Sequence, residues 1–221
     1  MPTKSMDHIV RMSPSCMGRR NAIDLFGEWA KNGRDEGMEK GHFASVIEMF
    51  GIARTRLPSK FSAIDVGCGN GWAVRQLQNI AGCQVASGVD GSLDMIEKAR
   101  KIHPVGDYKH GQLPTWIPDQ QYDLVVSMEF MYYLEDPFSF IGTIYDKWLT
   151  ANGCLAFGID HYLENTESLS WPSSLGLKLA TKSEKEWTRA MHRAGFTGVE
   201  SFRVQIREGW EGTLVIVGTK R

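Results

Sequence analysis

The sequence predicts an α/β fold in which helices cover both faces of a doubly wound, mostly parallel sheet of seven strands. Three observations support this prediction. Between residues 61 and 160, short apolar runs alternate with amphipathic stretches, the pattern of strand–helix–strand units. Three alternating glycines directly follow the first apolar run, where such sheets bind ligands. Two apolar runs separated by a turn end the sequence and predict an antiparallel hairpin.

Composition narrows the possible functions. The chain has 221 residues, a formal net charge of −1 and 42% hydrophobic residues, which suits one domain over residues 1–221. No apolar run approaches the about 20 residues that cross a bilayer, and no secretory signal is indicated. The balanced charge argues against nucleic acid or an anionic membrane as partner. The four cysteines are far apart, so no metal site is indicated, and we expect a cytoplasmic protein.

Residues 1–60 are predicted to form a helical cap. One apolar stripe at helical spacing lies within residues 22–29, and a second lies within residues 43–53. The stretch between them is rich in charge and glycine, which is typical of a solvated turn. In an alternative interpretation, this stretch closes over a ligand, which Arg34 or His42 then contacts.

Residues 61–160 are predicted to form the ligand-binding core. Strands are expected at 61–66, 83–89, 107–109, 122–128 and 154–159. Helices are expected at 72–80, at 92–102 with Ser92 as N-cap, and after the Asp136–Pro137 pair.

The last quarter of the chain is predicted to contain an insertion, a helix and the hairpin. Residues 160–182 are too long and polar for a simple connection and are expected on the substrate side of the sheet. Residues 183–221 begin with a capping box formed by Ser183 and Glu186, and the hairpin strands are expected at 199–206 and 213–218.

The glycine loop carries the strongest functional signal. Gly67, Gly69 and Gly71 allow a sharp turn and a close approach of the backbone to a ligand. A dinucleotide fingerprint requires a small residue where this chain has Trp72, so that reading is disfavoured. Asp65 precedes the first glycine by two residues.

A second acid, Asp90, ends the second predicted strand. Strands one and two are neighbours in a doubly wound sheet, so Asp90 is expected beside the glycine loop, where its carboxylate can accept both hydroxyls of a ribose. Alternatively, Asp90 is a helix N-terminal acid favoured by the helix dipole. Ser92 suffices as the cap of that helix, which favours the ribose role.

These segments resemble the class I S-adenosylmethionine-dependent methyltransferases, specifically the small-molecule type related to the ubiquinone-biosynthesis enzymes. The resemblance covers about residues 61–160 and is carried by IDVGCGNGWAVRQL, GVDGSLDMIEKAR, QLP, YDLVVSMEFMYYLEDP and GCLAFGI. It implies a Rossmann-like methyltransferase fold, S-adenosylmethionine as cofactor and S-adenosylhomocysteine as product. The implied cofactor-binding residues are Asp65, Gly67, Cys68, Gly69, Asn70, Gly71, Asp90, Gly91, Met95, Gln112, Leu113 and Met128.

Two of these assignments have alternatives. Met95 is expected against the adenine ring, but helix core is an equal interpretation. Relatives often have an aspartate a few residues before the Leu-Pro pair, which contacts the adenine amino group. This chain has none there, so the Gln112 amide or backbone groups of residues 110–113 must serve.

Candidates for the methyl-acceptor side follow strands four and five. Glu129 is predicted to meet a cationic acceptor or the cofactor ammonium, or to be a solvated loop acid. Tyr133 or its neighbour Tyr132 is expected to wall the pocket. His161 lies just beyond strand five, where a general base is needed if the acceptor carries a proton, and Tyr162 follows it. Alternatively, His161 is a surface histidine that is hydrogen-bonded to its own loop.

The leading hypothesis is methyl transfer to a small molecule at a nitrogen, oxygen, sulfur or carbon nucleophile. Two alternatives remain at this point: a non-catalytic partner subunit that keeps the cofactor pocket, and a methyltransferase acting on RNA or protein. The sequence does not specify the acceptor or the oligomeric state.

Overall fold

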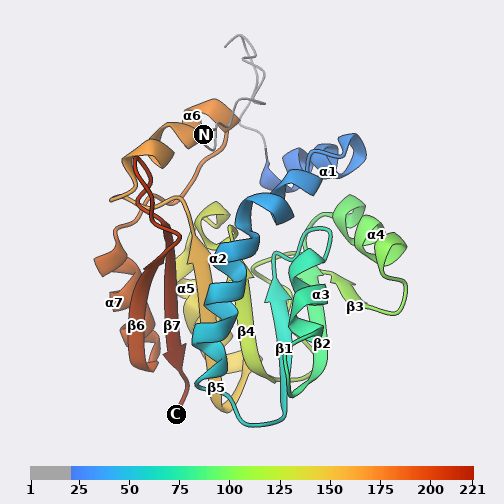
Figure 1. The fold of residues 1–221 in the computed structure, drawn as a ribbon, viewed down its shortest axis with the longest axis vertical. Coiled ribbons are helices and arrows are strands. Elements are labelled where there is room, and N and C mark those ends of the chain that lie inside the picture. Colours follow the sequence, from blue (N-terminus) through green and yellow to red (C-terminus); the bar gives the residue numbers. More distant parts are fainter. Residues whose placement is uncertain (1–20) are drawn as a thin grey trace.

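A computed structural model describes residues 21–221, so the start of the predicted cap, including Cys16, lies outside the described residues. One sheet of seven strands has the order β3-β2-β1-β4-β5-β7-β6 (Figure 1). Only the last strand of the sequence, β7, runs antiparallel to its neighbours. The predicted fold class is confirmed. The strands are β1 (Phe61–Val66), β2 (Cys83–Asp90), β3 (Asp107–His110), β4 (Tyr122–Met128), β5 (Leu149–Ile159), β6 (Thr197–Val204) and β7 (Thr213–Thr219).

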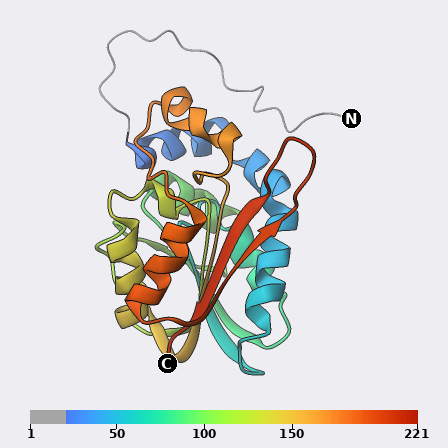
Figure 2. The ribbon, with the colours of Figure 1, turned by 90° about the vertical axis from the view of Figure 1, so that its left-hand side faces the viewer.

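Helices cover both faces of the sheet (Figure 2). Helices α2, α3 and α4 share a buried apolar cluster on one face, and α5 and α7 share another on the opposite face. Helices α1 and α6 lie beyond the carboxyl ends of the parallel strands (Figure 1). The helices are α1 (Ala22–Asn32), α2 (Glu36–Arg54), α3 (Trp72–Gln78), α4 (Leu93–Ile102), α5 (Pro137–Thr143), α6 (Trp171–Leu175) and α7 (Glu184–Ala194).

Local capping signals determine several helix ends. The Ser92 hydroxyl accepts a hydrogen bond from the Met95 amide, as predicted. The complete capping box of Ser183 and Glu186 opens α7, and Gly195 closes this helix in the left-handed conformation. No helix within the described part of the chain is long and apolar enough to cross a membrane.

Some boundaries differ from the prediction for a structural reason. Strand β5 begins at Leu149, five residues before the predicted 154–159 segment, because Leu149 pairs with Tyr122 of β4 across an irregular register. The hairpin strand β6 starts at Thr197, where it pairs with Thr219. Pairing with a neighbouring strand extends each segment beyond its apolar run.

The two N-terminal helices have different surroundings. Helix α1 contacts α4 at the carboxyl edge, whereas most of α2 packs on the sheet against β5. Only the start of α2 reaches the edge. There Asp35, just before α2, accepts hydrogen bonds from Asn70 Nδ2 and from Lys98 Nζ, both at 2.7 Å. This buried group fixes the α1–α2 turn to the glycine loop and to α4.

Candidate functional site

The loop after β1 turns sharply at the carboxyl edge of the sheet. Gly67, Gly69 and Gly71 have φ angles of 75°, 52° and 76°, a region that glycine enters without steric cost. The amide of Gly67 donates to the carbonyl of Val89 at 2.9 Å, which ties the loop to the end of β2. A Cβ at Gly69 would enter open space, with Met95 Sδ as its nearest neighbour at 3.9 Å. Gly69 therefore leaves room for a ligand against the backbone.

Asp90 is part of the same loop system. Its carboxylate accepts hydrogen bonds from the amides of Gly69 at 2.9 Å and Ser92 at 2.7 Å. Burial nevertheless raises the pKa of Asp90 above its usual value. The structure thus brings Asp90 beside the glycine loop, as the adjacency of β1 and β2 predicted.

Asp65 at the end of β1 is the most perturbed acid of the site. Burial, and then the negative charge of Asp90, raise the pKa of Asp65 from 3.8 to about 7. Both acids line one pocket. A positively charged ligand bound between them would relieve this repulsion, so their electrostatics favour a cation.

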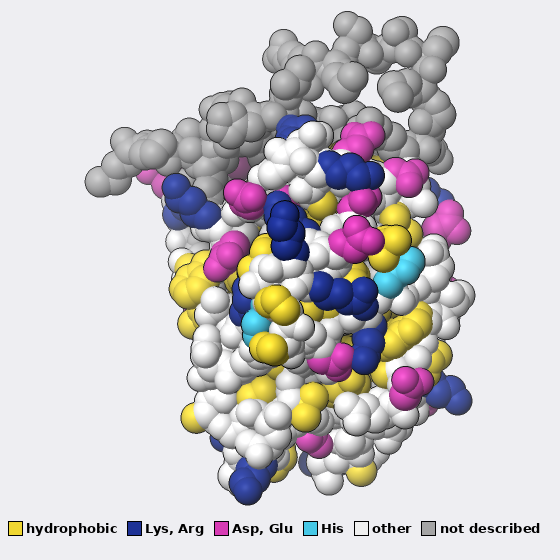
Figure 3. Space-filling view, turned by 90° about the vertical axis from the view of Figure 1, so that its right-hand side faces the viewer, with side chains coloured by type: hydrophobic (Ala, Val, Ile, Leu, Met, Phe, Trp, Pro, Cys, Tyr) yellow, Lys and Arg dark blue, Asp and Glu magenta, His cyan; other side chains and the backbone are white. Residues whose placement is uncertain are grey.

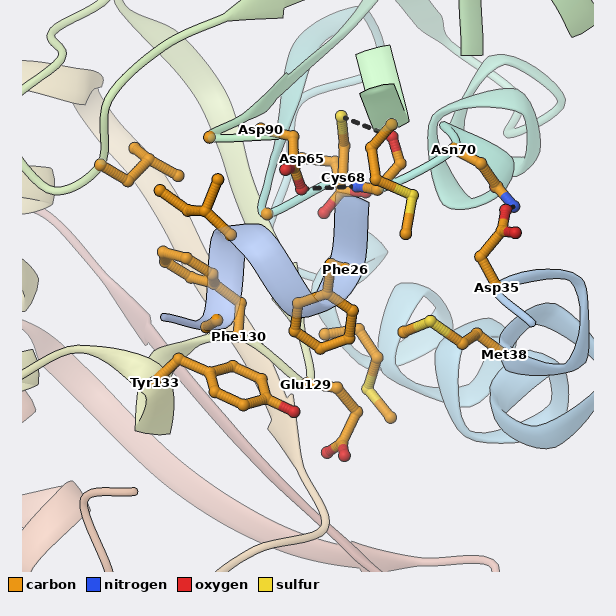
Figure 4. Close-up of a pocket in the computed structure, with 18 of the residues that line it drawn as sticks. Phe26, Asp35, Met38, Asp65, Cys68, Asn70, Asp90, Glu129, Phe130 and Tyr133 are labelled. Carbon is orange, nitrogen blue, oxygen red and sulfur yellow. Dashed lines mark hydrogen bonds between the residues drawn. The ribbon is translucent and has the colours of Figure 1, made fainter. Parts of the chain in front are cut away.

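The pocket lies between the carboxyl edge of the sheet and helices α1 and α2, and the space not filled by protein atoms, including open solvent at its mouth, is about 1180 Å³. Figure 4 shows Asp65, Cys68 and Asp90 on one side of it, and Glu129 and Tyr133 on the other. We call these the donor end and the acceptor end. The pocket is lined by Asn21, Ala22, Ile23, Phe26, Asp35, Met38, His42, Asp65, Gly67, Cys68, Gly69, Asn70, Trp72, Ala73, Asp90, Gly91, Met95, Gln112, Leu113, Met128, Glu129, Phe130, Tyr133 and Leu134.

All the expected cofactor-binding residues except Gly71 are among these. Gly71 has a packing role instead: a Cβ there would lie 2.3 Å from Tyr108 Cε1, and Tyr108 is buried under the loop. Only glycine fits between the loop and this ring. The predicted contact between Gly71 and the cofactor is not supported by this geometry.

Glu129 is the acidic residue that lines the acceptor end. It directly follows β4 with a φ of 56°, a conformation that non-glycine residues seldom adopt. Its carboxylate is buried and accepts hydrogen bonds from the Tyr132 hydroxyl, at 2.7 Å, and from the Asp160 amide. The alternative of a solvated loop acid is therefore wrong. Of the two neighbouring tyrosines, Tyr133 lines the pocket and Tyr132 packs in the core.

His42 reaches the acceptor end from the second turn of α2. Its Nδ1 atom lies 3.6 Å from Asp160 Oδ2, and the other oxygen of Asp160 accepts a hydrogen bond from the Thr213 hydroxyl at 2.6 Å. His42 lines the pocket, whereas the buried Asp160 lies behind it. Ligand atoms of His42, Glu129 and Asp160 all lie within 4.8 Å of one another.

His161 and Tyr162 do not line the pocket. The buried His161 ring has Nδ1 3.0 Å from the carbonyl of Ser168 and Nε2 2.8 Å from the Thr181 hydroxyl, so both nitrogens are engaged within the insertion. The Tyr162 hydroxyl donates to the carbonyl of Gly212 at 2.8 Å. This geometry corrects the two catalytic assignments: these side chains anchor the 160–182 segment.

Sequence reasoning did not identify several pocket residues. Phe26 of α1 and Met38 of α2 project into the space between the two ends (Figure 4). Phe130 supports the loop, because a Cβ at Gly67 would lie 2.6 Å from its ring. The stripe containing Phe26 was recognised, but an apolar helical face looks the same whether it covers a sheet or a ligand. Asp35 carried no local signal beyond its place in a charged turn.

A protein-family model described as a methyltransferase domain matches residues 28–201, most of the chain. The chain belongs to the class I S-adenosylmethionine-dependent methyltransferases. Among curated relatives, it is 29% identical over 132 residues to a trans-aconitate 2-methyltransferase of Rhizobium rhizogenes, a match covering 60% of this chain and 49% of that protein. It is 27% identical to a malonyl-[acyl-carrier protein] O-methyltransferase of Halalkalibacterium halodurans, covering 58% and 53%. The chain spans about half the length of the curated relatives it matches.

Solved structures share the fold of this methyltransferase. A chain from the complex of the Haloferax volcanii Trm112 methyltransferase activator with a methyltransferase aligns with a TM-score of 0.74 and 27% identity, over 91% of this chain and 99% of that one. The N-methyltransferase NodS of Bradyrhizobium japonicum, in complex with S-adenosyl-L-homocysteine, aligns with a TM-score of 0.70 and 16% identity, over 91% and 99%. The second likeness concerns the fold alone.

S-adenosylmethionine is the cofactor of this family, and the donor end of this methyltransferase fits it. The Asp90 carboxylate suits the two ribose hydroxyls, and the open space at Gly69 admits the cofactor close to the backbone. Asp65, whose pKa is raised to about 7, suits the positive charges of the methionine part. Met95 and Leu113 add apolar lining to this end of the pocket. The residues present thus match the chemistry of the group.

Proposed function

We propose that this methyltransferase transfers the methyl group of S-adenosylmethionine to a small molecule bound at the acceptor end. The supporting observation is that a single pocket is lined both by Asp90 and by Glu129. The lining extends past the two acids of the donor end to Phe26, Met38, Glu129 and Tyr133, so residues suited to an acceptor lie in the same pocket as the cofactor acids.

The chain's own residues act mainly by alignment. When bound, the cofactor supplies a methyl group already activated on a positive sulfur. Asp65 and Asp90 hold the donor at one end, and Glu129 lies where an acceptor meets the methyl group. Phe26 and Met38 cover the space between the ends and exclude water from it. Such fixed alignment in a dry site contributes much of the rate of a bimolecular transfer.

A small acceptor is favoured over a macromolecule by the cover that helix α1 gives the pocket and by the surface charge. Helix α1 crosses the carboxyl edge, and its first residues share a surface groove with Leu177–Lys182 of the insertion. On the face formed by α4 and β3, Lys and Arg side chains are interspersed with Asp and Glu, without a continuous basic patch (Figure 3). Nucleic-acid binding normally depends on such a patch.

Cofactor binding and turnover test this proposal separately. S-adenosylhomocysteine at a hundredfold excess over its dissociation constant should stabilise the fold by about 2.7 kcal/mol, measured as a rise in melting temperature. NAD should have no comparable effect. Labelled S-adenosylmethionine incubated with a pooled set of small amines, alcohols, thiols and carboxylates should then give a methylated product by mass spectrometry. Stabilisation with no product from any class would instead support a non-catalytic binding protein.

A further inference from the structure

We propose that the acceptor of this methyltransferase is a small amine, bound through its N–H groups by Glu129 and His42. This inference rests on the proposed function and specifies its substrate class. It starts from the charges at the acceptor end. Glu129 and His42 line the pocket, and Asp160 lies directly behind His42. With ligand atoms within 4.8 Å of one another, these three side chains can surround a single positive centre.

The rest of the lining supports a cationic or N–H-bearing acceptor. Among residues 21–221, which the structure describes, no Lys or Arg lines the pocket, whereas Asp65, Asp90 and Glu129 do. Asp35 also lines it, but its charge is balanced by Lys98. A carboxylate acceptor would place another negative charge beside the buried Glu129, and burial makes such like-charge contacts costly. The relatives named for trans-aconitate and malonyl-[acyl-carrier protein] act on acidic molecules, so we infer a different acceptor here.

Hydrogen bonds within the protein also hold the acidic side chains of the acceptor end in position for a positively charged acceptor. Two hydrogen bonds, from the Tyr132 hydroxyl and the Asp160 amide, hold the Glu129 carboxylate in one orientation. The Thr213 hydroxyl holds Asp160 against His42. Fixed dipoles and charges of this kind need no reorganisation during the reaction. The aromatic rings of Phe26 and Tyr133, 5.2 Å apart between centroids, offer an apolar wall for the body of the acceptor.

The chemical step balances with these residues alone. The bound ammonium first gives one N–H proton to the His42 imidazole, and Asp160 stabilises the resulting imidazolium. The lone pair of the amine nitrogen, now neutral, forms the N–C bond to the methyl group, while the S–C bond breaks and its electron pair stays on sulfur. The positive charge passes from sulfur to nitrogen, next to the Glu129 carboxylate, which stabilises it. The product leaves as the N-methylated ammonium, and the His42 imidazolium returns its proton to solvent.

Three probes that share a phenyl ring and differ in the polar end test this inference: 2-phenylethylamine, 2-phenylethanol and phenylacetate. Each is titrated into the protein saturated with S-adenosylhomocysteine, and binding is measured by calorimetry and by the shift in melting temperature. The amine should bind at least about tenfold more tightly than the other two, since a charge-assisted hydrogen bond is worth about 1.5–3 kcal/mol, a factor of about 10 to 150. With labelled S-adenosylmethionine, the amine should give the N-methylated product.

Glu129→Gln is the deciding variant, because it keeps the shape and removes the charge. Its amide oxygen can still accept from the Asp160 amide, and its NH2 group can donate to the Tyr132 hydroxyl oxygen in place of the bond that the carboxylate accepts. It should weaken amine binding about 10- to 100-fold and change the affinity for S-adenosylhomocysteine less than twofold, which also reports that the variant is folded. Glu208→Gln, the same change in the exposed β6–β7 turn, should alter neither affinity. His42→Gln provides a second variant and should lower methylation of the amine more than its binding.

The outcomes separate this inference from the proposed function. If phenylacetate or 2-phenylethanol binds as tightly as the amine, if no amine binds, or if Glu129→Gln leaves amine binding unchanged, the amine inference is overturned while the methyltransferase proposal stands. A stabilisation by Mg²⁺ or Mn²⁺ alone that Glu129→Gln abolishes would assign the three side chains to a metal ion and also overturn it. Failure of S-adenosylhomocysteine itself to bind would contradict the proposed function.

Discussion

The donor end and the acceptor end of the pocket are assembled in different ways. The donor end comes mainly from two short segments, residues 65–70 and 90–95, on neighbouring strands. The acceptor end combines His42 of α2, Glu129 after β4 and Asp160 after β5. A site made of contiguous residues leaves a recognisable pattern in the sequence, whereas a site assembled across the fold does not.

The two ends also differ in what surrounds their acidic side chains. At the donor end, burial raises the pKa of Asp65 to about 7, and the neighbouring charge of Asp90 adds to this effect. At the acceptor end, Glu129 and Asp160 each accept hydrogen bonds from protein groups. The donor end is therefore poised for a cationic ligand, whereas the acceptor end already holds its carboxylates in fixed positions. Four substitutions test this difference.

The largest effect is expected from Gly71→Ala, which concerns the scaffold of the donor end. An alanine at φ 76° costs about 1–2 kcal/mol, and its Cβ at 2.3 Å from the Tyr108 ring adds about 1–3 kcal/mol of overpacking. The free energy of unfolding should fall by about 2–5 kcal/mol in urea denaturation. Gly176→Ala is the matched control, because Gly176 has a φ of 67° and no atom within 4 Å of its added Cβ. Equal losses in the two variants would show that the Tyr108 contact is unimportant.

Asp90→Ala is expected to impair cofactor binding at the donor end and to leave the acceptor end unchanged. It removes the carboxylate proposed to accept hydrogen bonds from the ribose, so affinity for S-adenosylhomocysteine should fall by about 1.5–3 kcal/mol in calorimetry. Asp119→Ala, which removes an exposed acid before β4, should leave the affinity unchanged. An unaltered affinity in Asp90→Ala would return Asp90 to the role of a helix N-terminal acid.

His161→Gln tests whether the insertion contributes to chemistry or only to structure. Loss of the hydrogen bonds to Ser168 and Thr181 should lower the free energy of unfolding by about 1–2 kcal/mol. The affinity for S-adenosylhomocysteine should stay the same, and turnover should change less than tenfold at temperatures where the variant is folded. His192→Gln, on the exposed face of α7, should change neither property. A turnover loss of about 100-fold or more with normal stability would restore His161 as a general base.

The smallest effect concerns Asp65, which should make the free energy of unfolding of the cofactor-free protein depend on pH. The pKa of this acid is raised on folding, so the native state binds a proton that the unfolded chain has released, and stability falls as pH rises toward 7. Between pH 6 and pH 7 this amounts to about 1 kcal/mol, and Asp65→Asn should remove it. Saturation with S-adenosylmethionine should also reduce it, because the cofactor's positive charge favours the carboxylate. If the free energy of unfolding changed with pH in the same way in the unsubstituted protein and in Asp65→Asn, the raised pKa of Asp65 would be contradicted.

The prediction of individual elements succeeded where the signal was local. The Ser183–Glu186 capping box and the Ser92 cap depend on residues a few positions apart, and both are present as expected. The start of β5 at Leu149 depends on pairing with Tyr122, which no local pattern contains. His161 was assigned correctly to the carboxyl end of a strand, but its neighbours in the fold turn its ring into the insertion.

By itself, the sequence determined the fold class and most of the donor end, because alternating apolar runs, glycines and acids act over short distances along the chain. Only the tertiary structure decided which face of α1 lines the pocket, that Gly71 packs against Tyr108, and that His42 and Asp160 meet beside Glu129. Those contacts join residues far apart in the sequence, and they arise from helix and sheet packing that allows many partners for the same apolar or charged side chain.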